Sequence, residues 1–280
     1  MILVTGAAGK TGRALIEKLA ARGQAVRALV RANRRDAPPH ASMANVEYVE
    51  GDLLDAASLS AALKDVRALY LICPNMHPKE EVMGELVIKA AQQNGVEHFV
   101  YHSVLHPQVE AMPHHWHKMR VEERLFASGL PFTILQPTAY MQNLLANFKD
   151  NVLRNPYPVE ARLSLIDLND VAEAAATVLT ERGHENAIYE LCGTAPLSQT
   201  QVAEIFSQVL GHPVRAEAMP LETWEHNARA AGLNDYVRET LLAMFHYYAH
   251  FGLADNPNVL RWLLKREPAS LESFVRNYLA

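Results

Sequence analysis

The chain has 280 residues, 49% of them hydrophobic and 20% charged, which is enough for one large α/β domain or for a domain with a smaller appendage. Its formal net charge of −5 gives no reason to expect a nucleic-acid-binding surface, although a local basic cluster can still hold an anionic cofactor. No segment approaches the ~18 uninterrupted apolar residues of a membrane-spanning helix, so no membrane contact is expected.

The cysteine content and the first residues bear on the cellular compartment. Cys73 and Cys192 are the only cysteines and lie far apart in the sequence. So few cysteines predict a reduced, cytoplasmic protein and exclude a structural zinc site built from cysteines. The first residues, MILVTGAAG, lack the basic segment and long apolar run of a signal peptide, so we expect no cleaved leader.

In the first half of the chain, short apolar runs alternate with helical patterns. We expect strands at 1–5, 25–31, 46–52, 68–74, 98–104 and 131–137, and helices at 11–22, 58–65, 80–95 and 117–129. This alternation, with β-branched runs bounded by Gly and Pro, predicts a parallel sheet wrapped by helices.

After residue 137 the pattern is less regular. Residues 163–180 predict a short strand, an Asp-capped turn and an Ala-rich helix that returns to the first body. A strand at 187–193 and a helix at 198–211, with Ser198 as its N-cap, follow. The remainder, 221–280, is mostly helical and rich in aromatic residues.

The strongest local signal is V-T-G-A-A-G-K-T-G at 4–12, which follows the first strand and opens the first helix. Gly6 permits a tight turn, Gly9 lets the backbone approach a pyrophosphate, and Gly12 lets helix and strand pack closely. The free N–H groups at the start of the helix favour an anion. The predicted cofactor contacts in this loop are Gly6, Ala8, Gly9, Lys10, Thr11 and Gly12. The alternative is a Gly-rich turn without a ligand.

The end of the second strand bears on the choice between NAD and NADP. It reads A-L-V-R-A-N-R-R-D, with Arg31, Arg34 and Arg35 and no acidic residue before Asp36. NAD sites usually place an acidic residue there, whereas an arginine accommodates the 2′-phosphate of NADP. We therefore expect NADP(H), with Arg31 as the best single phosphate ligand. At least one of Arg34 and Arg35 is better explained by a solvated basic loop.

Two further strand ends lie where ligands of open α/β sheets bind. Asp52 and Leu53 follow the third strand, where an adenine would lie. Cys73, Pro74 and Asn75 follow the fourth strand and would line the path of the ribose and nicotinamide. Both sets are equally well explained as turn residues.

Taken together, these segments resemble the NmrA-like group of atypical short-chain dehydrogenase/reductases over essentially the whole chain. The segments that carry the resemblance are TGAAGKTG, LVR at the second strand end, GD at 51–52, HFVYHSV at 98–104, K-x-x-x-E at 118–122, SGLPFTILQP at 128–137 and DLNDVA at 167–172. The resemblance implies a Rossmann-type doubly wound parallel sheet with a smaller, mostly helical C-terminal lobe, and NADP as the usual ligand. We expect the NADP-binding domain at 1–150, with 163–193 returning to it, and the lobe for substrate or partner at 194–280.

The resemblance also identifies candidate catalytic residues. Ordinary short-chain reductases use a Tyr-x-x-x-Lys pair, in which the lysine holds the nicotinamide ribose and lowers the pKa of the tyrosine. Here Lys118 aligns with the lysine, but His114 stands in the position of the tyrosine, and no tyrosine lies between Tyr101 and Tyr140. Water, His114 or Lys118 would then supply the proton; an unperturbed histidine has a pKa of about 6.5. Ser103 occupies the place of the family's serine and would orient a substrate oxygen, unless its hydroxyl only satisfies local backbone.

Six histidines lie between residues 98 and 117. A zinc site needs about four converging ligands. His98 and His102 would lie about 13 Å apart on one face of a strand, and the adjacent His114 and His115 would point in different directions. We therefore expect no metal site, and we expect His115 and His117 to lie on the surface.

Family members divide into NAD(P)H-dependent reductases of quinones or plant phenylpropanoids and dinucleotide sensors that act through a protein partner. The aromatic segment 243–251 would cap a flat, apolar acceptor, unless it forms core or a subunit interface, and Tyr140, Met141 and Asn143 would face the same cleft. We therefore expect an NADPH-dependent reductase of a quinone-like or other conjugated small molecule. The alternative is a non-enzymatic NADP(H) sensor with a regulatory protein partner; a homodimer is also compatible with the sequence.

Overall fold

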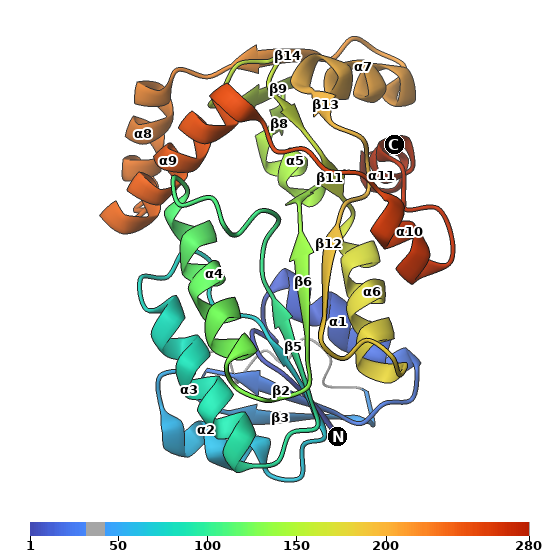
Figure 1. Cartoon of the computed structure of the whole chain (residues 1–280). Coiled ribbons are helices and arrows are strands. Elements are labelled where there is room, and N and C mark those ends of the chain that lie inside the picture. Colours follow the sequence, from blue (N-terminus) through green and yellow to red (C-terminus); the bar gives the residue numbers. More distant parts are fainter. Residues whose placement is uncertain (32–42, 280) are drawn as a thin grey trace. The chain divides into compact units, whose positions relative to one another are not determined.

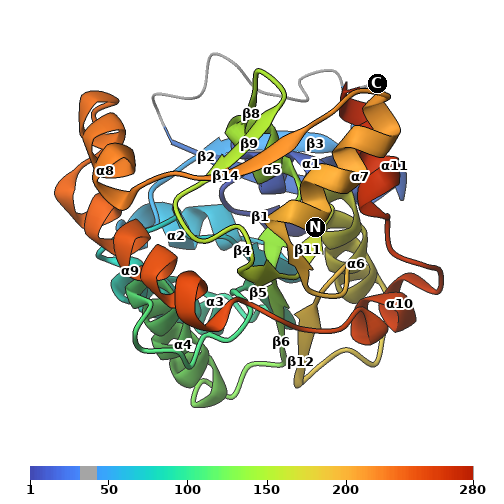
Figure 2. The same cartoon turned by 90° about the horizontal axis from the view of Figure 1, so that it is seen from above.

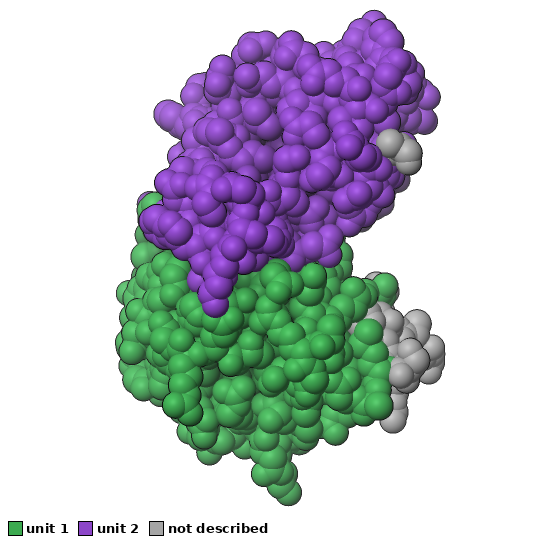
Figure 3. All heavy atoms as spheres, turned by 90° about the vertical axis from the view of Figure 1, so that its right-hand side faces the viewer, with its two compact units in different colours: residues 1–108, 114–136, 171–189 green, residues 109–113, 137–170, 190–280 purple. Residues whose placement is uncertain are grey.

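The structure is a computed structural model that describes residues 1–31 and 43–279. The described residues form two compact units, coloured separately in Figure 3. Unit 1 comprises residues 1–108, 114–136 and 171–189, and unit 2 comprises 109–113, 137–170 and the chain from 190 onward.

Unit 1 is built on a seven-stranded sheet with the strand order β12-β6-β5-β4-β1-β2-β3. In chain order its strands are β1 (Ile2–Val4), β2 (Val26–Val30), β3 (Val46–Glu50), β4 (Ala68–Leu71), β5 (His98–His102), β6 (Phe132–Pro137) and β12 (Ala187–Leu191). Strands β1 to β6 pair in parallel. β12 also runs parallel to β6, because Asn186 N donates to Phe132 O and Thr138 N donates to Leu191 O. The predicted parallel sheet is therefore confirmed.

Helices cover both faces of this sheet (Figures 1 and 2). One face carries α2 (Ala56–Leu63), α3 (Glu80–Gln93) and α4 (Pro113–Phe126), and the other carries α1 (Lys10–Ala21) and α6 (Leu168–Thr180). The chain builds outward from β1 in one direction through β2 and β3, and in the other through β4, β5 and β6. Ligands of such doubly wound sheets bind beyond the carboxyl ends of the strands near this change of direction.

Apolar strands and small residues explain how these layers pack. All four residues of β4 are buried, as expected for a central parallel strand with helices on both faces. On one face, α3 approaches α4 so closely that a Cβ added at Gly84 would lie 2.6 Å from both methyl carbons of Val121. The buried side chains of α2, α3 and α4 join those of the strands in one apolar core.

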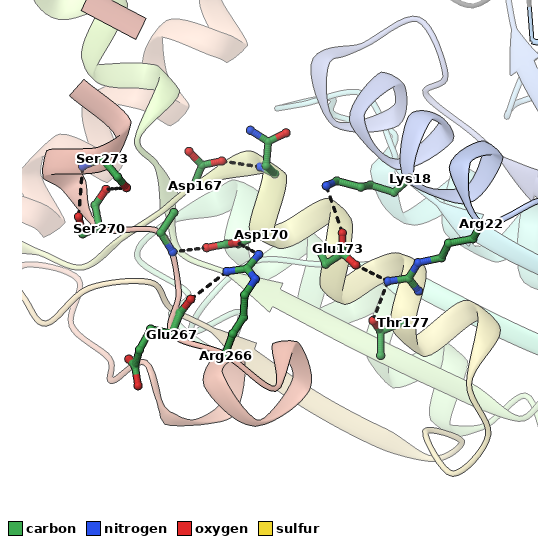
Figure 4. Close-up of polar contacts among 12 residues, drawn as sticks. Lys18, Arg22, Asp167, Asp170, Glu173, Thr177, Arg266, Glu267, Ser270 and Ser273 are labelled. Carbon is green, nitrogen blue, oxygen red and sulfur yellow. Dashed lines mark hydrogen bonds and ion pairs between the residues drawn. The ribbon is translucent and has the colours of Figure 1, made fainter. Parts of the chain in front are cut away.

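On the other face, polar contacts join α1 to α6, as Figure 4 shows. The carboxylate of Glu173 pairs with Arg22 and, at 3.1 Å, with Lys18. Arg22 also donates to Thr177 Oγ1 at 3.2 Å. These contacts tie the C-terminal end of α1 to α6.

Unit 2 contains shorter elements. Its strands are β7 (Ala139–Tyr140), β8 (Phe148–Lys149), β9 (Val152–Asn155), β10 (Arg162–Leu163), β11 (Leu165–Ile166), β13 (Leu197–Ser198) and β14 (Arg215–Ala218), and its helices are α5 (Gln142–Asn147), α7 (Gln199–Leu210), α8 (Leu221–Ala230), α9 (Asp235–Phe251), α10 (Asn258–Leu264) and α11 (Leu271–Leu279). Phe206 of α7 and Phe274 of α11 are central to its core. Ser198 caps α7 as expected, in a capping box with Gln201.

The C-terminal part of unit 2 is anchored by Asp170, which lies in the first turn of α6 (Figure 4). Its buried carboxylate accepts hydrogen bonds from Arg266 Nη2 and from the backbone N–H of Ala269, each at 2.6 Å. The contacts on both carboxylate oxygens hold the segment between α10 and α11 against the start of α6.

Two features differ from the expectations. Helix α4 begins at Pro113, four residues before the expected start at 117, so His114 and His115 are helical. The three-stranded sheet β14-β9-β8 was not expected, because its strands span only two to four residues and carry no clear alternation. Among the described helices none is both long and apolar enough to cross a membrane.

Candidate functional site

The glycine loop between β1 and α1 has a conformation that only glycines allow. Gly6 has a φ of +58°, in the left-handed region that glycine adopts without steric cost. A Cβ at Gly12 would lie 2.4 Å from the carbonyl oxygen of Gly6 and 2.9 Å from Cα of Ala7, and one at Gly9 would lie 3.2 Å from the same oxygen. The loop is therefore closed tightly on itself, and its backbone is open to a ligand.

The start of α1 forms the second half of this loop. Its N-cap is Gly9, and no side chain caps the helix. The N–H groups of the first turn are therefore not occupied by a capping side chain, and the helix dipole favours a negative charge there. Thr5 Oγ1 fixes the base of the loop, since it donates to Ile72 O at 2.9 Å and accepts from Ile72 N at 2.7 Å. The loop therefore fits a pyrophosphate.

The expected nucleotide contacts at the next two strand ends differ in their surroundings. Arg31 is exposed directly after β2, whereas Arg34 and Arg35 lie outside the described residues. Asp52 Oδ1 accepts the backbone N–H of Leu54 at 2.9 Å and so closes its own turn. Leu53 is buried in the core against α2 and α3. The contacts of Arg31, Asp52 and Leu53 with a cofactor stay predictions.

The expected cofactor contacts after β4 also differ in solvent exposure. Cys73 is buried in the core, while Pro74 and Asn75 are exposed. Burial and the charge of Glu80 raise the pKa of the Cys73 thiol, against the opposing effect of Lys118. The thiol is therefore uncharged at neutral pH and serves as a small apolar group.

A buried ion pair organises the ends of β4 and β5. Lys118, on α4, donates through Nζ to Oε1 of Glu80 at 2.6 Å, and Glu80 has no solvent exposure. Tyr101 donates its hydroxyl to the same oxygen at 3.2 Å. The ammonium also lies 5.6 Å from the centre of the Tyr101 ring and 3.4 Å from the carbonyl oxygen of His102. Glu80, which the sequence reasoning did not single out, therefore sets the position of Lys118.

The charge of Lys118 is stable in this environment. Burial is the largest single effect and lowers the pKa of Lys118, but the charge and hydrogen bond of Glu80, together with Cys73 and Glu122, outweigh it, so that the net pKa is raised. For Tyr101, burial and then the charge of Glu80 raise the pKa well above its usual range. Lys118 therefore remains an ammonium and Tyr101 remains a neutral phenol at neutral pH. Tyr101 does not replace the missing tyrosine, because its hydroxyl is already committed to Glu80.

A second buried network lies beside the first. Ser103, directly after β5, donates its hydroxyl to Oε1 of Glu122 on α4. Gln136 of β6 donates to both carboxylate oxygens of Glu122 at 3.0 Å each. Burial raises the pKa of Glu122, although the hydrogen bonds from Ser103 and Gln136 and the charge of Lys118 act in the opposite direction. The hydroxyl of Ser103 is therefore part of a side-chain network and not only a partner of local backbone.

Two of the three histidines of α4, His114 and His115, are buried. Burial, together with the charges of His115, Lys118 and His117, lowers the pKa of His114 to about 2, so its imidazole is neutral near pH 7. A neutral imidazole does not favour His114 as the proton source over water or Lys118, and the role of His114 stays a prediction. His115 was expected on the surface but has no solvent exposure, because the helix that begins at Pro113 turns it inward. His117 is partly exposed and donates through Nδ1 to Glu81 Oε1 at 2.9 Å.

The expected substrate residues lie in unit 2. Met141 is fully buried in the core of that unit, Tyr140 is half-buried and Asn143 is exposed. In the aromatic segment, Phe245 packs edge-on against Trp224 at a ring separation of 4.8 Å, whereas Phe251 is 74% exposed. Part of the aromatic segment is therefore core, and its role toward an acceptor stays a prediction.

Three polar residues of these networks were missed or noted only as part of a family pattern: Glu80, Glu122 and Gln136. Sequence periodicity showed that their elements exist but not that carboxylates would be buried there. The K-x-x-x-E spacing did place Lys118 and Glu122 on one face of a helix, and that was the available signal. In the part of the chain that the structure describes, no three His, Cys, Asp or Glu side chains converge to hold a metal.

Comparison with known proteins gives the same family over the whole chain. The NmrA-like family model matches residues 1–278. An NAD(P)H azoreductase from Xenophilus azovorans is 30% identical over 253 residues, covering 88% of this chain and 86% of that protein. Quinone oxidoreductase 2 from Escherichia coli K12 is 27% identical over 279 residues, covering 98% and 97%.

Solved structures agree. The NADPH complex of the Escherichia coli NADPH-dependent quinone oxidoreductase matches with a TM-score of 0.87 at 27% identity, covering all of both chains. The NADP(H) complex of the triphenylmethane reductase from Citrobacter sp. matches equally well, with the same TM-score, identity and coverage. NmrA itself, a negative transcriptional regulator, shares the fold at 19% identity with a TM-score of 0.84. The chain belongs to the NmrA-like family.

Proposed function

We propose that the protein is an NADPH-dependent reductase that transfers a hydride to a quinone-like or other conjugated small molecule. The observation that carries the proposal is the full-length likeness to a quinone oxidoreductase and a triphenylmethane reductase, both crystallised with the NADP cofactor, in a chain with a tightly closed glycine loop. Quinones, azo compounds and triphenylmethane dyes share an extended conjugated system that accepts a hydride. A flat, conjugated acceptor is therefore the common substrate class.

In this proposal, unit 1 binds the dinucleotide. The pyrophosphate lies against the backbone of Gly6, Ala8 and Gly9 and the first turn of α1, which begins with Lys10, Thr11 and Gly12. Arg31 holds the 2′-phosphate through its planar guanidinium group. The strand-end residues expected beside the adenosine and nicotinamide are Asp52, Leu53, Cys73, Pro74 and Asn75. Where a side chain already has protein contacts, the residue would contact the cofactor through its backbone atoms.

The chain's own residues then orient the reactants. When bound, the dihydronicotinamide supplies the hydride. Lys118 keeps its charge because Glu80 stabilises it, and it directs only one of its three N–H groups to that carboxylate at short range. A further N–H is available for a ribose hydroxyl, in line with the role of this lysine in short-chain reductases. Neutral His114, one helical turn earlier on α4, lines the same region and is not an acid at neutral pH.

The test is steady-state loss of NADPH absorbance with a panel of acceptors: a quinone, an azo dye, a triphenylmethane dye and, as the contrasting class, a simple ketone. We expect turnover with the conjugated acceptors and none with the ketone, because reduction of an isolated carbonyl relies on the tyrosine that this chain lacks. Absence of turnover with all conjugated acceptors would refute the proposal.

The cofactor preference is tested by Arg31→Ala. Loss of the guanidinium removes one charge-assisted phosphate contact, worth about 1.5–3 kcal/mol, or roughly 10- to 100-fold in affinity. We expect the dissociation constant for NADPH to rise by that factor and the constant for NADH to stay unchanged, both measured by fluorescence titration. Arg13→Ala, an exposed arginine on α1, is the comparison variant. An equal loss for NADPH and NADH would remove Arg31 from the phosphate site.

A second candidate function is a non-enzymatic NADP(H) sensor that acts through a protein partner. The observation in its favour is that no tyrosine occupies the usual position and that His114 is neutral. This alternative predicts a clear difference in affinity between NADPH and NADP⁺ without turnover of any acceptor. Calorimetric titration with both forms of the cofactor, combined with the acceptor panel, separates the two functions.

A further inference from the structure

Reduction of a conjugated acceptor by one hydride leaves an anion that must take up one proton. The usual donor is absent, because no tyrosine lies four residues before Lys118. His114 is uncharged, and the Lys118 ammonium is stabilised by a buried carboxylate. The question is which described group beside the strand ends can both hold a proton and give it up.

Ser103 and Glu122 meet this requirement by their geometry. Ser103 is held at the carboxyl end of β5, since its backbone N–H donates to Leu135 O at 2.8 Å. Its hydroxyl contacts Glu122, and both residues are 2% exposed. Gln136 Nε2 donates to both oxygens of the Glu122 carboxyl group at 3.0 Å each, including the oxygen that Ser103 contacts, and so orients the carboxyl group beside Ser103.

The direction of the Ser103–Glu122 hydrogen bond depends on the charge of Glu122. An ionised carboxylate only accepts, so it holds the hydroxyl hydrogen of Ser103. A protonated carboxyl group can donate to Ser103 Oγ, and the hydroxyl hydrogen is then free to turn toward a ligand. The pair therefore has one state that presents a proton and one that withholds it.

We propose that Ser103 and Glu122 form a proton relay, in which Ser103 is the immediate donor to the reduced acceptor and Glu122 resupplies Ser103. This inference rests on the proposed reductase function. As the acceptor gains the hydride, its developing anion takes the Ser103 hydroxyl proton, and the serine oxygen takes the proton of the Glu122 carboxyl group. The O–H bonds broken at Ser103 and Glu122 are matched by new ones at the acceptor and at Ser103. Glu122 ends as a carboxylate and is reprotonated from solvent before the next turnover.

The surroundings of Glu122 suit this role. Burial raises the pKa of the Glu122 carboxyl group, so its protonated form persists to higher pH than in an exposed glutamate. The titratable groups that face it are Lys118 on its own helix, Tyr101 on β5 and, through Lys118, Glu80 on α3. β6 contributes only the neutral Gln136. The hydrogen bonds from Ser103 and Gln136 and the charge of Lys118 oppose protonation of Glu122, but burial outweighs them, and Lys118 is itself paired with Glu80.

The experiment compares the wild type with Glu122→Gln, Ser103→Ala and, as a matched control, Glu123→Gln, which changes the exposed neighbour on α4. The turnover number with NADPH and 1,4-naphthoquinone is measured as a function of pH at saturating cofactor. We expect wild-type turnover to fall as pH rises through the Glu122 pKa. Glu122→Gln and Ser103→Ala should each lose about 100-fold in turnover and show no such fall, since general acid catalysis contributes factors of this size. Glu123→Gln should match the wild type.

Two further measurements separate a relay from a structural role. The NADPH dissociation constant should be unchanged in both variants, which shows that the site is folded. The infrared carboxyl band that disappears in Glu122→Gln should titrate at higher pH in Ser103→Ala, because the carboxylate has lost a hydrogen-bond donor. If Glu122→Gln does not fold, the pH dependence of turnover and the NADPH dissociation constant of Ser103→Ala decide the outcome.

The outcomes are distinct. A wild type without turnover of any acceptor contradicts the reductase function and this relay together. A wild type that turns over, with a pH dependence unchanged in both Glu122→Gln and Ser103→Ala, contradicts the relay alone. A carboxyl band that does not respond to Ser103→Ala also contradicts it, whatever the turnover.

Discussion

At the scale of single residues, the central feature is that Lys118 and Glu80 share one buried site. Their side chains are 10% and 1% exposed, and both charges are therefore largely removed from water. Such a pair contributes little net stability compared with apolar side chains, but removing one partner leaves an uncompensated buried charge. The pair is better explained by the fixed position that it gives to the ammonium group than by the stability that it adds.

We predict that Glu80→Gln and Lys118→Met each lower the free energy of unfolding by about 3–5 kcal/mol, since each leaves a buried charge without its partner. The double variant should lose less than the sum of the two, because it leaves no charge unpaired. Urea unfolding of the four proteins gives the coupling energy.

The matched control is the pair Lys89–Glu85, which has the same chemistry on the exposed surface of α3. Lys89→Met and Glu85→Gln should each change the free energy of unfolding by less than about 1 kcal/mol. Fully additive losses at Glu80 and Lys118 would show that the two side chains do not act as a pair.

At the scale of elements, the glycine loop depends on the close approach of α1 to its own turn. Gly12 lies within the first turn of α1, and the space for its Cβ is already filled by backbone atoms of Gly6 and Ala7. Backbone atoms cannot move aside as the end of a flexible side chain can. A methyl group at this position would therefore displace the start of α1 from β1.

Gly12→Ala should lower the free energy of unfolding by about 1–3 kcal/mol, as overpacking of a closed site does. It should also weaken NADPH binding by at least about tenfold, or ~1.4 kcal/mol, because the N–H groups of the first turn move. Thermal unfolding and fluorescence titration measure the two effects. Ala21→Ser, at the exposed last residue of α1, should change neither, and wild-type affinity in Gly12→Ala would contradict the importance of this contact.

The alternation of apolar runs was sufficient to predict the elements of unit 1, because its central strands are continuous buried apolar runs and its helices carry apolar residues at helical spacing. The start of α4 was missed, although proline is favoured at the first position of a helix and Pro113 stands there. Apart from the short strand expected at the start of 163–180, the short strands of unit 2 were not predicted, because their pairing depends on partners far away in sequence, such as β14 and β9.

The candidate site was predicted only in part, for a similar reason. The positions of Ser103, His114 and Lys118 follow from strand ends and helical spacing, which are local properties. The protonation of His114 depends on how much water the tertiary structure excludes, and the partner of Lys118 comes from a different helix. Neither property is encoded in the local pattern of residue types.

At the scale of the whole molecule, buried histidines determine how stability depends on pH. Burial is the largest cause of a lowered pKa at His98, His102, His114 and His115, and it brings the last three to about 3, 2 and 4. In the unfolded chain these histidines return to an ordinary value of 6.5. As pH falls below 6.5, the unfolded state therefore binds protons that the folded state does not, and the folded state loses stability.

Glu122 affects stability with the opposite sign, because its pKa is raised in the folded state. Its contribution to stability is present at low pH and is lost as the pH rises above 4.5, its ordinary pKa. The effect of one glutamate with a raised pKa does not balance the effect of several histidines with lowered pKa values. Carboxylates with a lowered pKa, such as Glu173, lose their contribution to stability only below pH 4.5. Loss of stability between pH 6.5 and 4.5 is therefore a property of the buried histidines.

We predict that the free energy of unfolding falls between pH 6.5 and 4.5, by about 1.4 kcal/mol per pH unit for each histidine that stays neutral only in the folded state. His114→Gln should reduce this slope by the contribution of one histidine, about 1.4 kcal/mol per pH unit, whatever its effect on the free energy of unfolding at pH 7. His226→Gln, an exposed histidine on α8, should leave the slope unchanged. Denaturant unfolding at a series of pH values gives the slopes. A slope that is the same in the wild type and His114→Gln would show that the His114 imidazole is already charged in the folded protein.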